Sequence, residues 1–281
     1  MYVTSSDGAT TFSSSRTGNF LSPGLSCDAS RKTNEDGESS NASKVKDFQT
    51  GQIWSYYSGK DDLPLYYCRI QKITVTQVFE EEAVVKICVY RLKATPFPAN
   101  VIQWEDKKMP VGCGTFMVTK IFEAFTTDDV SLLVVPQTSM DGTEHTILPK
   151  TGDVWAIYRS WTCHKEFKDM GSCSYDIVEV LDNTLDYKVL ALEPALFSNE
   201  EEGKNSFFRA AESRHPDWDV EDGLEVTFTI PKSKMLRFSH QIPATRVTKV
   251  VNGDLKELFE VDSRALPSNV RFQDHGVKRE Q

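Results

Sequence analysis

The segment GQIWSYY at residues 51–57 decides the fold, because its pattern returns as GDVWAIY at residues 152–158. Each copy is followed by two more strand-like segments, which are residues 66–70 and 84–92 in the first case. Ordered repetition of this kind indicates an internal duplication, so we expect two related β units. The shared positions are Gly51, Trp54 and Tyr57 in the first copy and Gly152, Trp155 and Tyr158 in the second.

The repeated pattern also predicts the kind of unit. Each tryptophan is an anchor large enough for a small β core, and the glycine before it permits a turn that a side chain would block. Short strands separated by turn clusters, with almost no helical periodicity, are typical of small barrels or strongly bent sheets. We therefore predict a mainly β fold (β-rich α+β) of two duplicated, small, barrel-like units packed as one compact domain.

Composition and the repeat together predict the boundaries of these units. Residues 1–46 are rich in serine and threonine and hold too few apolar side chains to offset the entropy of ordering them. We expect a disordered tail or linker there, a first β unit over 47–140, a second over 141–267 and a polar tail over 268–281.

Two shorter segments of the second unit carry local signals. The pair Asn252-Gly253 predicts a hairpin over residues 246–261, since this dipeptide favours a tight turn between two strands. Residues 207–213 are expected to form two turns of helix.

The charge of the chain disfavours several classes of partner. Its net charge is −9 with a pI near 5.2, so its field opposes a nucleic-acid backbone or an anionic membrane. The sequence contains no apolar run near the length of a membrane span and no secretory signal at its start. Its six scattered cysteines are expected to be reduced thiols, which places the protein in the nucleus or cytoplasm.

The segment MLRFSHQIPA at residues 235–244 combines an aromatic ring, a hydroxyl, an imidazole and a proline directly after an alternating strand. One interpretation places Phe238 in the core, with Ser239 and His240 hydrogen-bonded to backbone at a strand end before Pro243. The other makes His240 a polar contact in a ligand groove. We favour the structural interpretation, with the segment as the closing strand of the second unit.

Other clusters of reactive side chains lack the spacing of known sites. Cys163-His164 with Cys173 has no second pair of ligands for zinc. A catalytic nucleophile made from Cys113 and His240 would require these two side chains to lie close together in the fold, which the sequence does not show. The segment at residues 112–114, Gly-Cys-Gly, is too short for a phosphate loop but indicates a bulge or a close backbone approach. No cofactor and no metal are therefore expected.

Five aromatic residues have two interpretations. They could pack in the core, or they could line a cage for a methylated lysine, which cation–π attraction would favour. These residues are Trp54, Tyr56, Tyr66, Trp155 and Trp161. The acidic runs at residues 80–82 and 200–202 are expected to be solvated turns.

Several phrases of the sequence together resemble one family. They are FQTGQIWSYY at 48–57, LPLYYCRI at 63–70, PKTGDVWAIY at 149–158, YDIVEV at 175–180 and RFSHQIPA at 237–244. In this order they are similar to the plant domain-of-unknown-function family 3444, over roughly residues 47–267. The resemblance implies a domain that often lies C-terminal to a J domain in plant DnaJ-like proteins, without catalytic residues to carry over.

The first unit departs from the family pattern. Its third strand holds Tyr90-Arg91-Leu92 where the family usually has a tryptophan with an acidic partner. Residues 122–127 stand where a Phe-Ser-His-like segment usually closes the first half. The sequence also contains no His-Pro-Asp tripeptide, so no J domain is expected within it.

The combined expectation is a non-enzymatic protein-interaction module in a J-protein co-chaperone or transcription-linked assembly. Its partners would be Hsp70-linked or chromatin-linked proteins. The alternative is a reader of modified histone tails through the aromatic cage, and an enzyme is the third hypothesis. The candidate interaction or family-signature residues are Gly51, Trp54, Tyr57, Tyr66, Tyr67, Gly152, Trp155, Tyr158, Phe238, Ser239, His240 and Pro243.

Overall fold

The computed structural model describes most of the region from Phe48 to Val270. Its described residues are 48–59, 61–76, 84–95, 109–159, 161, 173–195, 206–213, 225–251 and 253–270. The predicted N-terminal tail at 1–46, both acidic runs and Cys163-His164 therefore lie outside the described residues, as does most of the predicted C-terminal tail.

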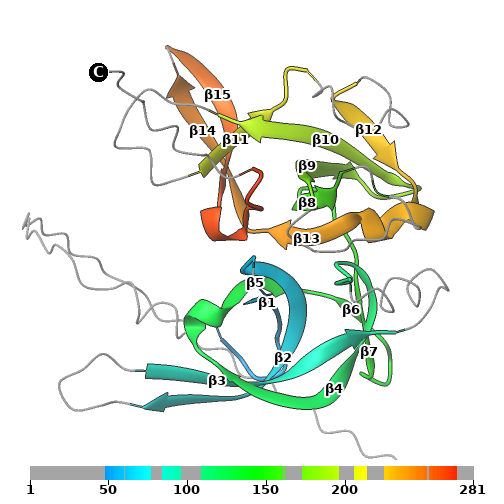
Figure 1. Cartoon of the computed structure of the whole chain (residues 1–281), viewed down its shortest axis with the longest axis vertical. Helices are drawn as coiled ribbons and strands as arrows, with labels where there is room; N and C mark the ends of the chain where they lie inside the picture. Colours follow the sequence, from blue (N-terminus) through cyan, green and yellow to red (C-terminus); the bar gives the residue numbers. More distant parts are fainter. Residues whose placement is uncertain are drawn as a thin grey trace, which may run out of the picture. The chain divides into compact units, whose positions relative to one another are not determined.

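The first half of the chain forms a curled antiparallel sheet with the strand order β5-β1-β2-β3-β4-β7-β6 (Figure 1). A short 3-10 turn, η1 (Thr127–Asp129), precedes β5. The strands are β1 (Ile53–Ser58), β2 (Leu63–Thr76), β3 (Val84–Ala94), β4 (Gly114–Phe125), β5 (Val130–Val134), β6 (Gln137–Thr138) and β7 (Glu144–Ile147).

The second half forms another antiparallel sheet with the path β13-β8-β9-β10-β11-β15-β14, and β12 pairs with β10. Two 3-10 segments flank its closing strands, η5 (Lys232–Arg237) and η6 (Ser263–Ala265). The strands are β8 (Val154–Tyr158), β9 (Tyr175–Asp182), β10 (Tyr187–Pro194), β11 (Ser206–Ala210), β12 (Thr227–Ile230), β13 (Phe238–Ile242), β14 (Ala244–Val251) and β15 (Asp254–Val261).

The predicted mainly β class is confirmed, because two curled antiparallel sheets make up the described region. The predicted hairpin is confirmed as β14 and β15, which pair from Ala244↔Val261 to Val251↔Asp254. The helix predicted over 207–213 is wrong. Those residues begin in β11, where Phe207 and Phe208 pair with β15 and bury their rings, so ladder pairing overrides the local pattern.

Both repeated segments begin with the same hydrogen-bonded turn. Gly51 and Gly152 take positive φ values of 92° and 89°, and each donates its N–H at 2.8 Å to a carbonyl of the second strand after it, Ile70 on β2 and Val180 on β9. The indole of Trp54 donates to Gln52 Oε1 at 3.0 Å, and that of Trp155 donates to an Asp153 carboxylate oxygen at 3.4 Å. The duplication itself stays a prediction, and these matching turns are consistent with it.

The apolar side chains form three main layers. One cluster fills the inside of the first sheet, for example Ile70, Ile87 and Val89, and another fills the inside of the second sheet around Trp155 and Phe238. The largest cluster joins the outer face of the first sheet to residues of the second, and it includes Ile53, Tyr67, Phe116, Ala156, Ile177, Ile242 and Leu266. Both sheets therefore share one core.

The last strand of the first sheet, β7, ends at Ile147, and the second sheet begins at Val154. The boundary predicted between residues 140 and 141 thus falls just before β7. Among the described helical segments, none has the length and apolar character needed to cross a membrane.

Candidate functional site: the junction of the two sheets

A buried segment from the first half of the chain, residues 109–113, runs against the closing strand of the second sheet. Tyr67 on β2 donates its hydroxyl to the carbonyl of Gly112 at 2.5 Å. The Cys113 thiol donates to the carbonyl of Met235 at 3.1 Å, and its side chain packs with Trp155 and Phe238. The first half therefore contributes a side chain to the core of the second.

Gly112 is where this segment comes closest to β13. A Cβ atom there would lie 2.1 Å from the carbonyl oxygen of Ser239 and 2.4 Å from that of Phe238. Those distances are far below van der Waals contact, and both oxygens belong to backbone. The close backbone approach predicted for the Gly-Cys-Gly segment is confirmed at Gly112.

His240 lies beside this contact and is fully buried. Its Nε2 is 2.9 Å from the carbonyl oxygen of Ala265, which can only accept, so Nε2 carries the proton. Nδ1 is then an acceptor, and the Ser239 hydroxyl donates to it at 3.1 Å. Ser239 is the bulged residue between Phe238 and His240 in the β13–β8 ladder, which explains how neighbouring side chains can face each other.

Burial sets the protonation of this group. It lowers the pKa of His240 to about 4, because a buried imidazolium would lose its hydration, while the hydrogen bond to Ala265 offsets part of that effect. Burial also raises the pKa of the Tyr158 and Tyr175 phenols near Ser239. His240 is thus a neutral imidazole with both ring nitrogens engaged inside the protein.

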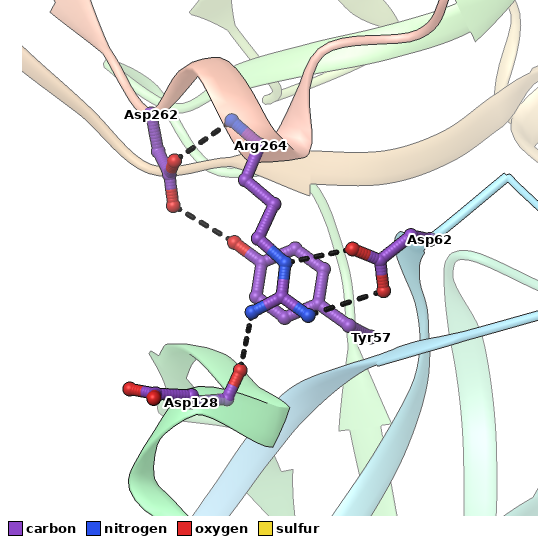
Figure 2. Close-up of polar contacts among 5 residues, drawn as sticks. All are labelled: Tyr57, Asp62, Asp128, Asp262 and Arg264. Atoms are coloured by element: carbon purple, nitrogen blue, oxygen red, sulfur yellow. Dashed lines mark hydrogen bonds and ion pairs between the residues drawn. The ribbon is translucent and has the colours of Figure 1, made fainter.

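The surface part of the junction centres on Arg264 of η6, shown in Figure 2. Its guanidinium carbon stands 3.8 Å from the centre of the Tyr57 ring. Its Nε and Nη2 donate to the two carboxylate oxygens of Asp62 at 2.8 and 3.1 Å, and Nη1 donates to the carbonyl of Asp128. One side chain of the second half therefore contacts three elements of the first.

Asp262 orders the same contact from the other side. Its carboxylate accepts the backbone N–H of Arg264 at 2.9 Å, which caps η6, and it accepts the Tyr57 hydroxyl at 2.8 Å. Burial raises the pKa of Tyr57, so the phenol stays a donor. Asp62 has a positive φ of 49°, a conformation that aspartate tolerates better than most residues and that is common where function or packing requires it.

A family model described as a domain of unknown function, DUF3444, matches residues 32–250. The chain belongs to this family. The resemblance to it is confirmed, whereas no curated protein and no solved structure matches the chain. The DUF3444 match ends before β15 and η6, so Arg264 and Asp262 lie beyond it.

The residues predicted as candidate interaction or family-signature positions fall into three places in the structure. Those of the two turns are Gly51, Trp54, Gly152 and Trp155. Those at the junction are Tyr57, Tyr67, Tyr158, Phe238, Ser239, His240 and Pro243, whose carbonyl accepts the N–H of Asp262. Tyr66 stands apart from both, 38% exposed beside Tyr56.

The five aromatics proposed as a cage do not form an open one. Trp155 and Tyr56 are 0 and 3% exposed, and Trp161 is also buried. The cation that faces the Tyr56 ring is the chain's own Arg91, at 5.7 Å. These five aromatic residues therefore do not support a methyl-lysine reader.

Sequence reasoning did not identify the polar half of the junction. Arg264 and Asp62 are paired across 202 residues. The one local signal was Asp262 two residues before Arg264, a spacing typical of a helix cap. In the described ranges no group of histidine, cysteine, aspartate and glutamate residues has the arrangement of a metal site.

The contacts of the junction in this DUF3444 chain hold its two sheets together. His240 holds η6 through Ala265 from inside, and Arg264 on the same turn binds the first sheet from outside. The family-signature segment is therefore connected to the contact between the sheets through one short 3-10 turn.

The ion pair in this contact gives a measurable prediction. We expect the unfolding free energies of Asp62→Ala, Arg264→Ala and the double variant to show a coupling of about 0.2–1 kcal/mol in urea denaturation. The bidentate geometry favours coupling, while the exposure of both side chains limits it. The coupling should shrink at 1 M salt, and strictly additive single effects would contradict the assigned contact.

Proposed function

We propose that the chain is a non-enzymatic protein-interaction module of a J-protein co-chaperone or transcription-linked assembly, in the nucleus or cytoplasm. The observation that carries the proposal is that three large apolar side chains of β4 are left exposed. Met117, Ile121 and Phe122 have exposed fractions of 46, 54 and 57%. Exposed apolar patches on a folded domain often mark the binding sites of other proteins.

The reactive side chains support a non-enzymatic role. Ser239, His240 and Cys113 are all fully buried, and burial raises the pKa of the Cys113 thiol. A substrate in solvent cannot reach a group in this environment without local unfolding. The link to J proteins rests on the DUF3444 resemblance, and the intracellular setting is supported by the free thiols of Cys68, Cys88, Cys113 and Cys173.

Affinity capture from a plant extract tests this function. The immobilised full chain is expected to retain a small set of proteins, with an Hsp70, a J protein or transcription-associated proteins among them, and each should rebind when purified. Retention of nothing above bare resin in low and physiological salt would overturn the proposal. Retention of unrelated proteins that rebind would keep the interaction module and exclude the co-chaperone setting.

A further inference from the structure

The outer face of β2, β3 and β4 has a part that lies beyond the cluster shared with the second sheet, where Lys72, Lys86 and Phe122 are exposed. Two rows of opposed residues cross the three strands: Arg69, Tyr90 and Phe122, then Lys72, Cys88 and Ala124. Because side chains alternate along a strand, these face away from Ile70 and Val89, which fill the inside of the sheet. Lys86 continues the face in the next row, opposite Thr74.

This face carries three basic residues, Arg69, Lys72 and Lys86, in a protein whose net charge is −9. Counted over both of their faces, the three strands hold six basic residues, Arg69, Lys72, Lys86, Arg91, Lys93 and Lys120, and a single acid, Glu123. That acid lies opposite Val89, on the inner face, where Arg91 binds it at 2.6 Å. Within the described residues, the side chains of Arg69, Lys72, Lys86 and Lys120 have no hydrogen-bond or ion-pair partner. Their charges are therefore uncompensated by this part of the chain.

An exposed aromatic pair stands among these charges. Phe122 is 57% exposed and meets the Tyr90 ring edge to face, with ring centres 5.8 Å apart. Ile121 next to it is also exposed. A large apolar side chain flanked by cations is the composition of an interface hot spot, in which the apolar group supplies affinity and the charges supply orientation and association rate.

We propose that this face of the first sheet binds a peptide segment of a partner protein in which acidic and apolar side chains are mixed. This inference rests on the proposed interaction function and names the surface and the partner chemistry. The acidic groups would pair with Lys72, Lys86 and Arg69, while an apolar side chain would pack on Phe122 and Tyr90.

The geometry favours a peptide over a nucleic acid. The Tyr90 and Phe122 rings are inclined at 70°, so they do not form the parallel platform on which successive bases stack. A long phosphate polymer would also meet the repulsion of the acidic chain as a whole. A short peptide is affected mainly by charges within a screening length of about 8 Å.

Selection from a display library of random peptides tests the inference without a known ligand. Peptides retained by the immobilised full chain are expected to be enriched in aspartate or glutamate together with leucine, phenylalanine or tryptophan. A labelled member of that set should then lose about tenfold in affinity with Phe122→Ser, and at least as much with Lys72→Glu/Lys86→Glu. Leu255→Ser/Lys256→Glu is the matched control, since it makes the same changes on the exposed tip of β15 and should alter the affinity less than twofold.

Four results would overturn the inference: no enrichment, enrichment of basic sequences, equal binding after the apolar residues of the peptide are replaced with serine, or tighter binding of a labelled oligothymidylate. Captured proteins that still bind the Lys72→Glu/Lys86→Glu variant would leave the interaction function intact and assign it to another surface. If the chain captures no protein and selects no peptide, both the proposed interaction function and the peptide-binding face are contradicted.

Discussion

Gly112→Ala is expected to destabilise the protein by about 3 kcal/mol or to prevent folding. The added Cβ would stand 2.1 Å from the Ser239 carbonyl oxygen, and the atom it meets is backbone at the β13 bulge, held on both sides by the ladder residues Phe238 and His240. Either the segment at 109–113 or strand β13 would have to move, and both are buried.

Thermal or urea unfolding measures the effect, and Gly142→Ala is the control. Gly142 has a positive φ of 71° but open space around its Cα, so alanine there should cost only about 1 kcal/mol of conformational strain. Gly112→Ala should therefore lower the unfolding free energy much more than Gly142→Ala does. A Gly112→Ala protein with the midpoint of the wild type would contradict the close contact between the two halves.

The second large effect concerns pH and His240. Its pKa is lowered from 6.5 to about 4 in the folded protein, so the unfolded chain binds a proton more readily than the native one. The stability that the neutral imidazole supports is complete above about pH 6.5 and is lost as the pH falls from there toward 4. The loss attributable to this one group is about 3 kcal/mol.

His240→Asn isolates that contribution, because asparagine does not titrate in this range. The difference in unfolding free energy between wild type and variant should stay constant from pH 7 to 8. It should then shift in favour of the variant as the pH falls toward 4. A difference that stays flat from pH 8 to 4 would show that His240 is not held as a buried neutral group.

The elements that sequence reasoning found are those whose signal is local. Alternating or continuous apolar runs identified β1, β2, β3, β8, β9 and β10, and the Asn-Gly turn identified the β14–β15 hairpin. Strand β5 was missed because its five residues make too short a run to stand out, and it is a strand by virtue of pairing with β1. For the same reason β11 was taken for a helix.

Some residues of the junction also have a local sequence signal, and others have none. Phe238, Ser239 and His240 stand out in sequence because unusual residue types are adjacent, and Gly112 stands out because two glycines flank a cysteine. Nothing near Asp62 or Arg264 indicates that they pair, since the contact exists only after both sheets have formed and meets across 202 residues. Contacts of this length are created by tertiary structure, and one sequence contains no periodicity that reports them.

The position of Cys113 in the core of the second sheet has a consequence for how the chain is made. Synthesis proceeds from the N-terminus, so residues 109–113 leave the ribosome well before β13, against which they pack. Until then the first sheet also carries the uncovered apolar face that includes Ile53, Tyr67 and Phe116. The nascent first half therefore exposes apolar surface and is prone to aggregate until the second half is made. Contacts so distant in sequence also favour slow folding. Because the two sheets share one apolar cluster, neither is expected to fold stably when it is produced without the other.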